Sequence, residues 1–174
     1  MTNIQNSLAL AFLPGYLFSC QYEQQLNKNR ENEPPPVTQN PDEASDQKLI
    51  RKFLKAIQSQ GFEYLEEILH PTFKCINTNT DSINNSKEEL DLWKSQHEKW
   101  KHISFEEPTL KSIVVNRGIL KGNWTLVWTT FSALDKRNLK PLKLDYHMAV
   151  KTEDNKIVEV QTWHQAEEEN STFF

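Results

Sequence analysis

A set of long strands between residues 119 and 164 constrains the fold of this chain more than any other feature. Residues 119–133 are rich in β-branched and aromatic side chains, which favour strands. Residues 142–151 alternate apolar with polar side chains, the period of two that is typical of a half-buried strand. A polar turn at residues 153–156 then leads into a returning strand at residues 157–163. These strands predict an antiparallel sheet with one apolar face that needs a cover.

Apolar side chains at helical spacing predict two helices ahead of this sheet. The first is centred on residues 49–57, with Ser45 or Asp46 as its cap and Gly61 as its terminator. The second is a shorter helix at residues 62–69, which Pro71 brings to an end. A short strand at residues 72–77 and a polar loop up to residue 85 follow.

A third helix is predicted to begin at Ser86, because Glu89 three residues later completes the pattern of a capping box. Its apolar stripe recurs at intervals of three, four and three residues, and consists of Leu90, Trp93, His97 and Trp100. A strand at residues 105–115 and a turn at residues 116–118 connect this helix to the long strands. The predicted fold class is therefore α+β, with three helices followed by an antiparallel sheet.

The composition excludes several classes of protein. A mild net charge of −4 leaves no basic surface for nucleic acid. The only cysteines, Cys20 and Cys75, are too few for a disulfide framework or a cysteine-rich zinc module. Four glycines, none of them clustered, exclude a phosphate-binding loop, and the sequence of a nucleophile elbow is absent. We therefore expect neither a metal nor a cofactor.

The first 19 residues, which carry no charge, are typical of a targeting signal. Their apolar core at residues 8–18 is about half as long as a bilayer-spanning helix, which suits a secretory signal. Residues 17–20, Leu-Phe-Ser-Cys, resemble the lipobox of bacterial lipoproteins, where a signal peptidase cuts before a lipid-modified cysteine. The resemblance implies a lipid on Cys20 and a location in the bacterial cell envelope. The alternative is an apolar N-terminus that packs on the domain of a cytoplasmic protein.

Residues 20–44 are predicted to form a disordered tether. Gln, Asn, Glu and Pro dominate this segment, so it offers too little apolar surface to offset the entropy lost on ordering. Its run of three prolines at residues 34–36 is a semi-rigid spacer. The predicted organisation is thus a signal at residues 1–19, a tether at 20–44, a folded domain at 45–166 and a tail at 167–174.

The order of the predicted elements resembles the SnoaL-like, nuclear-transport-factor-2-like superfamily. Residues 152–159, Thr-Glu-Asp-Asn-Lys-Ile-Val-Glu, are similar to the closing hairpin of that family, with Asn155 where a glycine usually stands. Trp163 matches an aromatic often found in the last strand. The resemblance implies a cone-shaped, cystatin-like fold, in which a curved antiparallel sheet and three N-terminal helices enclose an apolar pocket. Enzymes and non-catalytic binding proteins share this fold, so the function depends on the site.

The family's pocket suggests which residues of this chain could touch a ligand. On residues 142–151 the apolar, even-numbered positions are expected to face the helices, and the third helix is expected to turn its aromatic stripe toward them. Flat aromatic side chains suit an apolar ligand. The expected wall residues are Trp93, His97, Trp100, Trp124, Trp128, Tyr146 and Met148.

Catalytic members of the family move a proton with an Asp or His in the pocket, which gives four candidates here. His97 shares the stripe of the third helix, where a hydrogen-bonded structural role is the alternative. His164 faces inward if Val158 and Val160 do, and outward if the register slips by one residue. Asp145 and His147 share one face of their strand, and we expect that face to be the outer one.

Three functions remain open on the sequence alone. The domain could bind a small apolar molecule, it could catalyse an isomerase-type or dehydratase-type reaction without a cofactor, or it could be an interaction module. In the third case Lys143, Asp145 and His147 would lie in a homodimer interface on the outer face of the sheet.

Overall fold

The computed structural model describes residues 35–78 and 80–166, of which the last two are described by their backbone only. The chain divides into two compact units, residues 1–35 and 36–174, and the description that follows concerns the second. The predicted signal at residues 1–19, the lipid site Cys20, most of the tether and the tail at 167–174 lie outside the described residues.

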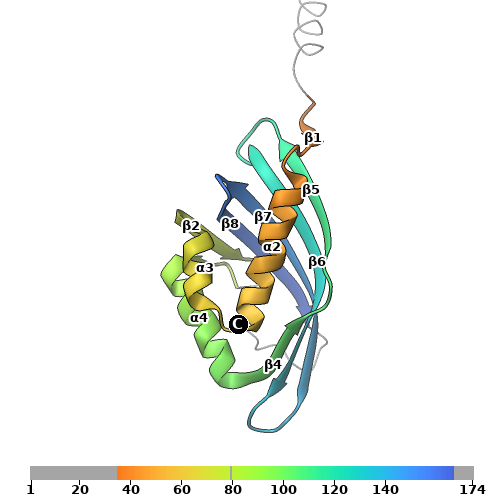
Figure 1. Ribbon diagram of the computed structural model, residues 1–174. Coiled ribbons are helices and arrows are strands. Elements are labelled where there is room, and N and C mark those ends of the chain that lie inside the picture. The colour runs from red at the N-terminus through yellow and green to blue at the C-terminus, as the bar shows by residue number, and fades with distance from the viewer. Residues whose placement is uncertain (1–34, 79, 167–174) are drawn as a thin grey trace, which may run out of the picture. The chain divides into compact units, whose positions relative to one another are not determined.

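An eight-stranded sheet forms one layer of the domain, and three helices form the other. The sheet is curved, and the helices lie on its concave side (Figure 1). The helices are α2 (Glu43–Gln58), α3 (Phe62–Ile68) and α4 (Ser86–Lys99). The strands are β1 (Val37–Gln39), β2 (Leu69–Asn77), β3 (Ser82–Asn85), β4 (Trp100–Phe105), β5 (Thr109–Val115), β6 (Gly122–Asp135), β7 (Pro141–Glu153) and β8 (Lys156–Ala166). The predicted α+β class, with a curved sheet and three helices, is confirmed.

The long strands β6, β7 and β8 form the centre of the sheet. Their order in the sheet is β1-β5-β6-β7-β8-β2-β3, with β4 paired to β6 beyond the end of β5. Neighbouring strands are antiparallel except for β2 and β8, which run parallel. A β-bulge between Lys151 and Thr152 shifts the register of β7 against β8. Because a bulge increases the local twist, it contributes to the curvature that lets the helices fit against the sheet.

Side chains from both layers meet in one apolar core. The even-numbered residues of β7 and the apolar stripe of α2 contribute five side chains each, the other helices and the strands β2, β4, β6 and β8 supply the rest, and the members are all at most 9% exposed. The most deeply buried large side chains include Ile50 and Ile57 of α2, Trp93 of α4, and Phe131 of β6. Burial of this apolar surface is the main stabilising contribution to the fold.

The structure corrects three of the predictions. Residues 82–85, predicted as the end of a polar loop, form β3, which pairs with β2. The ordered part starts before residue 45, because β1 pairs with β5 and α2 begins at Glu43 with Asp42 as its N-cap. The predicted strand at residues 105–115 begins later, since β5 starts at Thr109 and Phe105 is the last residue of a separate strand, β4, which starts at Trp100 where we predicted the end of the third helix. β4 and β5 pair with successive parts of β6. The polar tether composition did not reveal β1, because that strand is stabilised by backbone pairing with β5 rather than by buried side chains.

The N-terminus of α4 differs from its prediction by one residue. Asn85, not Ser86, is the N-cap, and Glu88 completes the capping box by accepting from the Asn85 backbone N–H at 2.9 Å. The predicted partner, Glu89, is turned into the core and is only 7% exposed. This one-residue difference is important for the site, because it leaves a buried carboxyl on the inner face of α4.

Candidate functional site

The strand parity on which the site assignments depend is settled by the pattern of burial. Tyr146 and Met148 of β7 are 3% and 2% exposed, whereas Asp145, which directly precedes Tyr146, is exposed. Across the sheet, His164 is paired with Tyr146, and Trp163 is paired with His147. The predicted inward position of Tyr146 and Met148 and the predicted outward position of Asp145 and His147 are therefore confirmed.

An aromatic cluster occupies the space between α4 and the sheet. Phe105 contacts Phe131 and Tyr146, with ring centroids 5.4 and 5.6 Å apart, and Trp93 contacts Phe105 at 6.3 Å. Aromatic rings at these separations gain attraction beyond the apolar surface they bury. Trp93, Trp100, Tyr146 and Met148, which we predicted as pocket wall, are thus members of the packed core.

Glu89 is a buried carboxyl group beside this cluster. Its oxygens accept hydrogen bonds from Asn84 Nδ2 at 3.0 Å and Trp93 Nε1 at 2.9 Å, and the Cys75 thiol is a third donor. Burial raises the pKa of the Glu89 carboxyl, and the three hydrogen bonds offset only part of that rise. Burial and the neighbouring Glu89 also raise the pKa of Cys75, so the thiol stays protonated and is not a nucleophile.

Tyr146 and His164 lie next to each other on the inner face of the sheet. Their rings are nearly parallel, with centroids 6.4 Å apart and an interplanar angle of 16°. Burial raises the pKa of the Tyr146 hydroxyl, which is hydrogen-bonded to Thr162, and burial lowers the pKa of His164. At neutral pH this arrangement therefore holds a neutral phenol beside a neutral imidazole.

His97, the predicted wall residue of the third helix, has a structural role. Its Nε2 lies 2.7 Å from the backbone oxygen of Ile57, and its ring contacts the edge of Phe62 at 5.9 Å. These contacts fix α4 against the end of α2 and the start of α3. In this turn of α4 the residue that is buried in the domain is Gln96, which is 6% exposed, rather than His97.

The outer face of the sheet carries two exposed tryptophans. Trp128, His147 and Trp163 are aligned across β6, β7 and β8 in one cross-strand row. Trp128 is 41% exposed and Trp163 is 39% exposed. Trp128, which we predicted on the pocket wall, therefore lies on the opposite face of the sheet, because its strand buries the odd-numbered positions Val127 and Phe131.

Trp124 shares the outer parity of Trp128 but is only 5% exposed. Its Nε1 donates to the backbone oxygen of Leu120 at 2.7 Å, and Lys151 Nζ lies 5.9 Å from the centre of its ring. Trp124 thus fixes the loop before β6 rather than lining a pocket with Trp93. The exposed row of aromatic residues is limited to the central part of the sheet.

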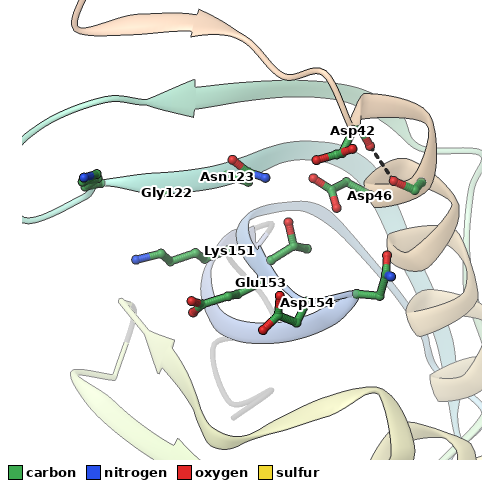
Figure 2. A pocket seen from close by; sticks show the side chains of 11 residues that line it. Asp42, Asp46, Gly122, Asn123, Lys151, Glu153 and Asp154 are labelled. Carbon is green, nitrogen blue, oxygen red and sulfur yellow. Dashed lines mark hydrogen bonds between the residues drawn. The ribbon is translucent and has the colours of Figure 1, made fainter.

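Among the clefts of the described residues, two lie at the border between the helices and the sheet. The larger, of about 620 Å³, is lined by polar residues from the start of α2, the start of β6 and the β7–β8 turn (Figure 2). The other, of about 440 Å³, lies between α2 and the β4–β5 connection, and Leu54 and Phe105 are among its lining residues. Neither cleft is lined by Trp93, Trp100, Tyr146 or Met148.

Within residues 35–78 and 80–166, no group of three or more His, Cys, Asp or Glu side chains is placed to bind a metal ion. No helix in the same part of the chain has the length and apolar character needed to cross a bilayer.

Two features of the site were not found from the sequence. The buried Glu89 was interpreted as a capping residue, although the pair Asn85 and Glu88 has the same spacing and could have been weighed against it. The exposed row was missed because Trp128 and Trp163 were considered strand by strand. Residues that are paired across neighbouring strands share one face of the sheet. Pairing Trp128 and Trp163 with the outward-facing His147 would therefore have placed both tryptophans on the outer face.

Comparisons with known proteins support the fold. No protein-family model matches the chain, and no curated protein matches it. A solved structure from Jannaschia sp. CCS1, provisionally named a SnoaL-like polyketide cyclase, is 10% identical with a TM-score of 0.58, covering 74% of this chain and 90% of that one. An NTF2-like protein from Burkholderia xenovorans LB400 is 13% identical with a TM-score of 0.56, covering 70% of this chain and 90% of that one.

A third similar structure is an LEH-like epoxide hydrolase from M. tuberculosis, 15% identical with a TM-score of 0.53, covering 72% of this chain and 86% of that one. At such identities the likeness concerns the fold. The chain therefore has the cone fold of SnoaL-like and NTF2-like proteins, as its closing hairpin suggested.

Proposed function

We propose that this chain is a binding module that pairs with a second copy of itself through the outer face of its sheet. The row of Trp128, His147 and Trp163 carries the proposal, because exposed tryptophans grouped on one surface are typical of protein interfaces. Leu126, Ala149 and Gln161 form the adjacent row on the same face. We call these six residues the outer patch.

A second copy is the occupant that fits the charges around the outer patch. An interface with two-fold symmetry uses the same surface twice, so that surface must contain both members of every ion pair across it. Lys143 and Asp145 lie on the same face of β7, next to the aromatic row, and carry opposite charges. A two-fold axis that crosses β7 between these two residues would bring Lys143 of each copy opposite Asp145 of the other. Within the chain, Lys143 Nζ lies 3.3 Å from the exposed Glu106 carboxylate, a partner that it would exchange for Asp145. The experiment that tests this is a measurement of the oligomeric state before and after substitution of the exposed tryptophans.

The proposal extends to the location of the protein. A lipid on Cys20 would anchor the module to a membrane of the bacterial cell envelope, with the segment up to β1 as spacer. Support comes from the residues around Cys20, which resemble a lipobox, and from the polar, proline-rich segment that follows. Two anchored copies would gain from the high local concentration that a shared membrane surface provides.

A small apolar molecule is the second candidate, and the cleft between α2 and the β4–β5 connection favours it. Leu54 and Phe105 supply buried apolar surface there. Of the charged lining residues, Arg51 pairs with Glu107 and Glu106 pairs with Lys143, which leaves Lys55 as the lining cation outside an ion pair within the described residues. Such a lining suits an apolar molecule with an anionic group, such as a fatty acid. Decanoate should raise the melting temperature of the wild-type chain and raise it less in Lys55→Gln. An equal rise in both, or no rise, would contradict this second candidate.

Cofactor-free catalysis has weaker support. Of the four candidate groups, Asp145 and His147 lie on the outer face and His97 contacts the backbone of Ile57. Only His164 remains on the inner face, beside Tyr146. The solved structures that share the fold include an epoxide hydrolase, but at 15% identity that activity is not transferred to this chain.

A further inference from the structure

The polar cleft beside the start of α2 is a second site, separate from the outer patch. Its walls come from three parts of the chain that are distant in sequence: the first turn of α2, the start of β6 and the turn between β7 and β8. Its volume of about 620 Å³ is within the range of small-molecule sites in proteins. In Figure 2 the labelled side chains from these elements surround a common space.

Four carboxylates line this cleft. Asp42 and Asp46 lie on the side of α2, and Glu153 and Asp154 lie across the cleft on the β7–β8 turn (Figure 2). Within the described parts of the chain, none of the four forms an ion pair. Asp46 is only 5% exposed and accepts from Asn40 Nδ2 at 2.7 Å. Facing carboxylates outside ion pairs create a negative potential inside the cleft.

Two lysines, Lys121 and Lys151, also line the cleft, and within the described residues neither forms an ion pair with the four carboxylates. Lys151 Nζ lies 5.9 Å from the centre of the Trp124 ring. Its side chain also passes over Gly122, where a Cβ atom would come within 2.5 Å of Lys151 Cε. With four carboxylates against two lysines, the cleft keeps an excess of negative charge.

Thr152 provides an independent sign of a ligand. It lines the cleft, its residue is only 4% exposed, and its Oγ1 has no hydrogen-bond partner among residues 35–78 and 80–166. A buried hydroxyl without a partner is destabilising, so native proteins rarely keep one unless something else pairs with it. A ligand with N–H donors would supply the missing partner.

We propose that this cleft binds an organic cation with several amino groups, of the polyamine class. The carboxylates are not close enough together to form a metal site within the described residues. They are instead distributed over two walls, so that a flexible chain with separated ammonium groups can contact both. The N–H groups would donate to the carboxylates and to Thr152 Oγ1.

Calorimetric titration of the full chain with spermidine tests this proposal. We expect saturable binding with one site per chain in the wild type. The double variant Glu153→Gln/Asp154→Asn removes two charges from the exposed turn and should weaken binding at least about tenfold, since hydrogen bonds to charged groups are strong. The matched control, Glu66→Gln/Glu98→Gln, removes two charges from exposed helix positions and should leave the affinity within about twofold, because surface charges at a distance are screened.

A further variant tests whether the ligand reaches the buried hydroxyl. Thr152→Val should weaken spermidine binding, and this loss should appear at unchanged net charge. An equal loss in the cleft variant and the matched control would mean that spermidine responds only to overall charge, and would overturn the proposal. Absence of saturable spermidine binding to the wild type would also overturn the proposal. The same conclusion would follow if Thr152→Val and Glu153→Gln/Asp154→Asn both bound spermidine with the affinity of the wild type.

Discussion

The imidazole of His147 lies parallel to the indole of Trp163, with ring centroids 6.1 Å apart and an interplanar angle of 2°. The two side chains belong to neighbouring strands and are directly paired across them. Each ring therefore restricts the rotamers of the other before any partner arrives. Ordering of side chains is a cost of association, so a surface that is already ordered binds more tightly for the same area.

The buried carboxyl of Glu89 should make the stability of the domain depend on pH. Its pKa is above the ordinary value of 4.5, so as pH falls the folded chain takes up this proton before the unfolded chain does. The stabilisation from Glu89 therefore grows as pH falls through the folded-state pKa and is complete near 4.5. It is lost as pH rises.

Urea unfolding of the wild type and Glu89→Gln at several pH values isolates this effect from His164, whose burial-lowered pKa acts in the opposite direction. The free energy of unfolding of the wild type, minus that of Glu89→Gln, should decrease between pH 4.5 and neutral pH. A constant difference would show that Glu89 is not desolvated in solution.

Gly122 should not tolerate a side chain. Its φ of +139° is accessible to glycine but strained for other residues, and a Cβ atom would displace Lys151 from Trp124. Gly122→Ala should lower the free energy of unfolding by about 1–3 kcal/mol, the usual cost of such backbone strain. In a Lys151→Ala background the loss should be smaller but still present, because only the steric part is relieved. An unchanged stability would mean that the start of β6 adopts another conformation.

The proposed lipid anchor predicts a simple fractionation result. In the native host, Cys20→Ala should move the protein from the membrane fraction to the soluble fraction, because the thioether-linked lipid can no longer form. Cys75→Ala is the control, since Cys75 is a buried thiol of the core and should leave the protein in the membrane fraction. Membrane association of the Cys20→Ala variant would contradict the lipoprotein proposal.

Most of the fold could be predicted from the sequence because its signals are local. The alternation in β7 fixed the inward position of Tyr146 and Met148, and the polar turn fixed the β7–β8 hairpin, whose Asp154 and Asn155 both have positive φ. Helical spacing in the same way indicated α2, α3 and α4.

The site could be predicted only in part, because its features depend on contacts between distant residues. Whether Trp128 faces a ligand or solvent depends on its pairing with His147, and whether Glu89 caps a helix or is buried depends on a choice between two equivalent capping boxes. The polar cleft combines residues 42–46 with residues 151–155, and no local pattern connects these segments. His164 in β8 is a further example. The sequence allowed it to face either side of the sheet, and its pairing with Tyr146 places it on the inner face.

Sedimentation equilibrium of the full chain tests self-association through the outer patch most directly. The wild type should have the mass of a dimer over a wide range of concentration. The double variant Trp128→Ser/Trp163→Ser should have the mass of a monomer with unchanged secondary structure. The control Leu139→Ser, which changes an exposed leucine (57%) in the β6–β7 turn, should remain a dimer. A wild-type chain that is monomeric at every concentration, or a double variant that still forms the dimer, would contradict the account.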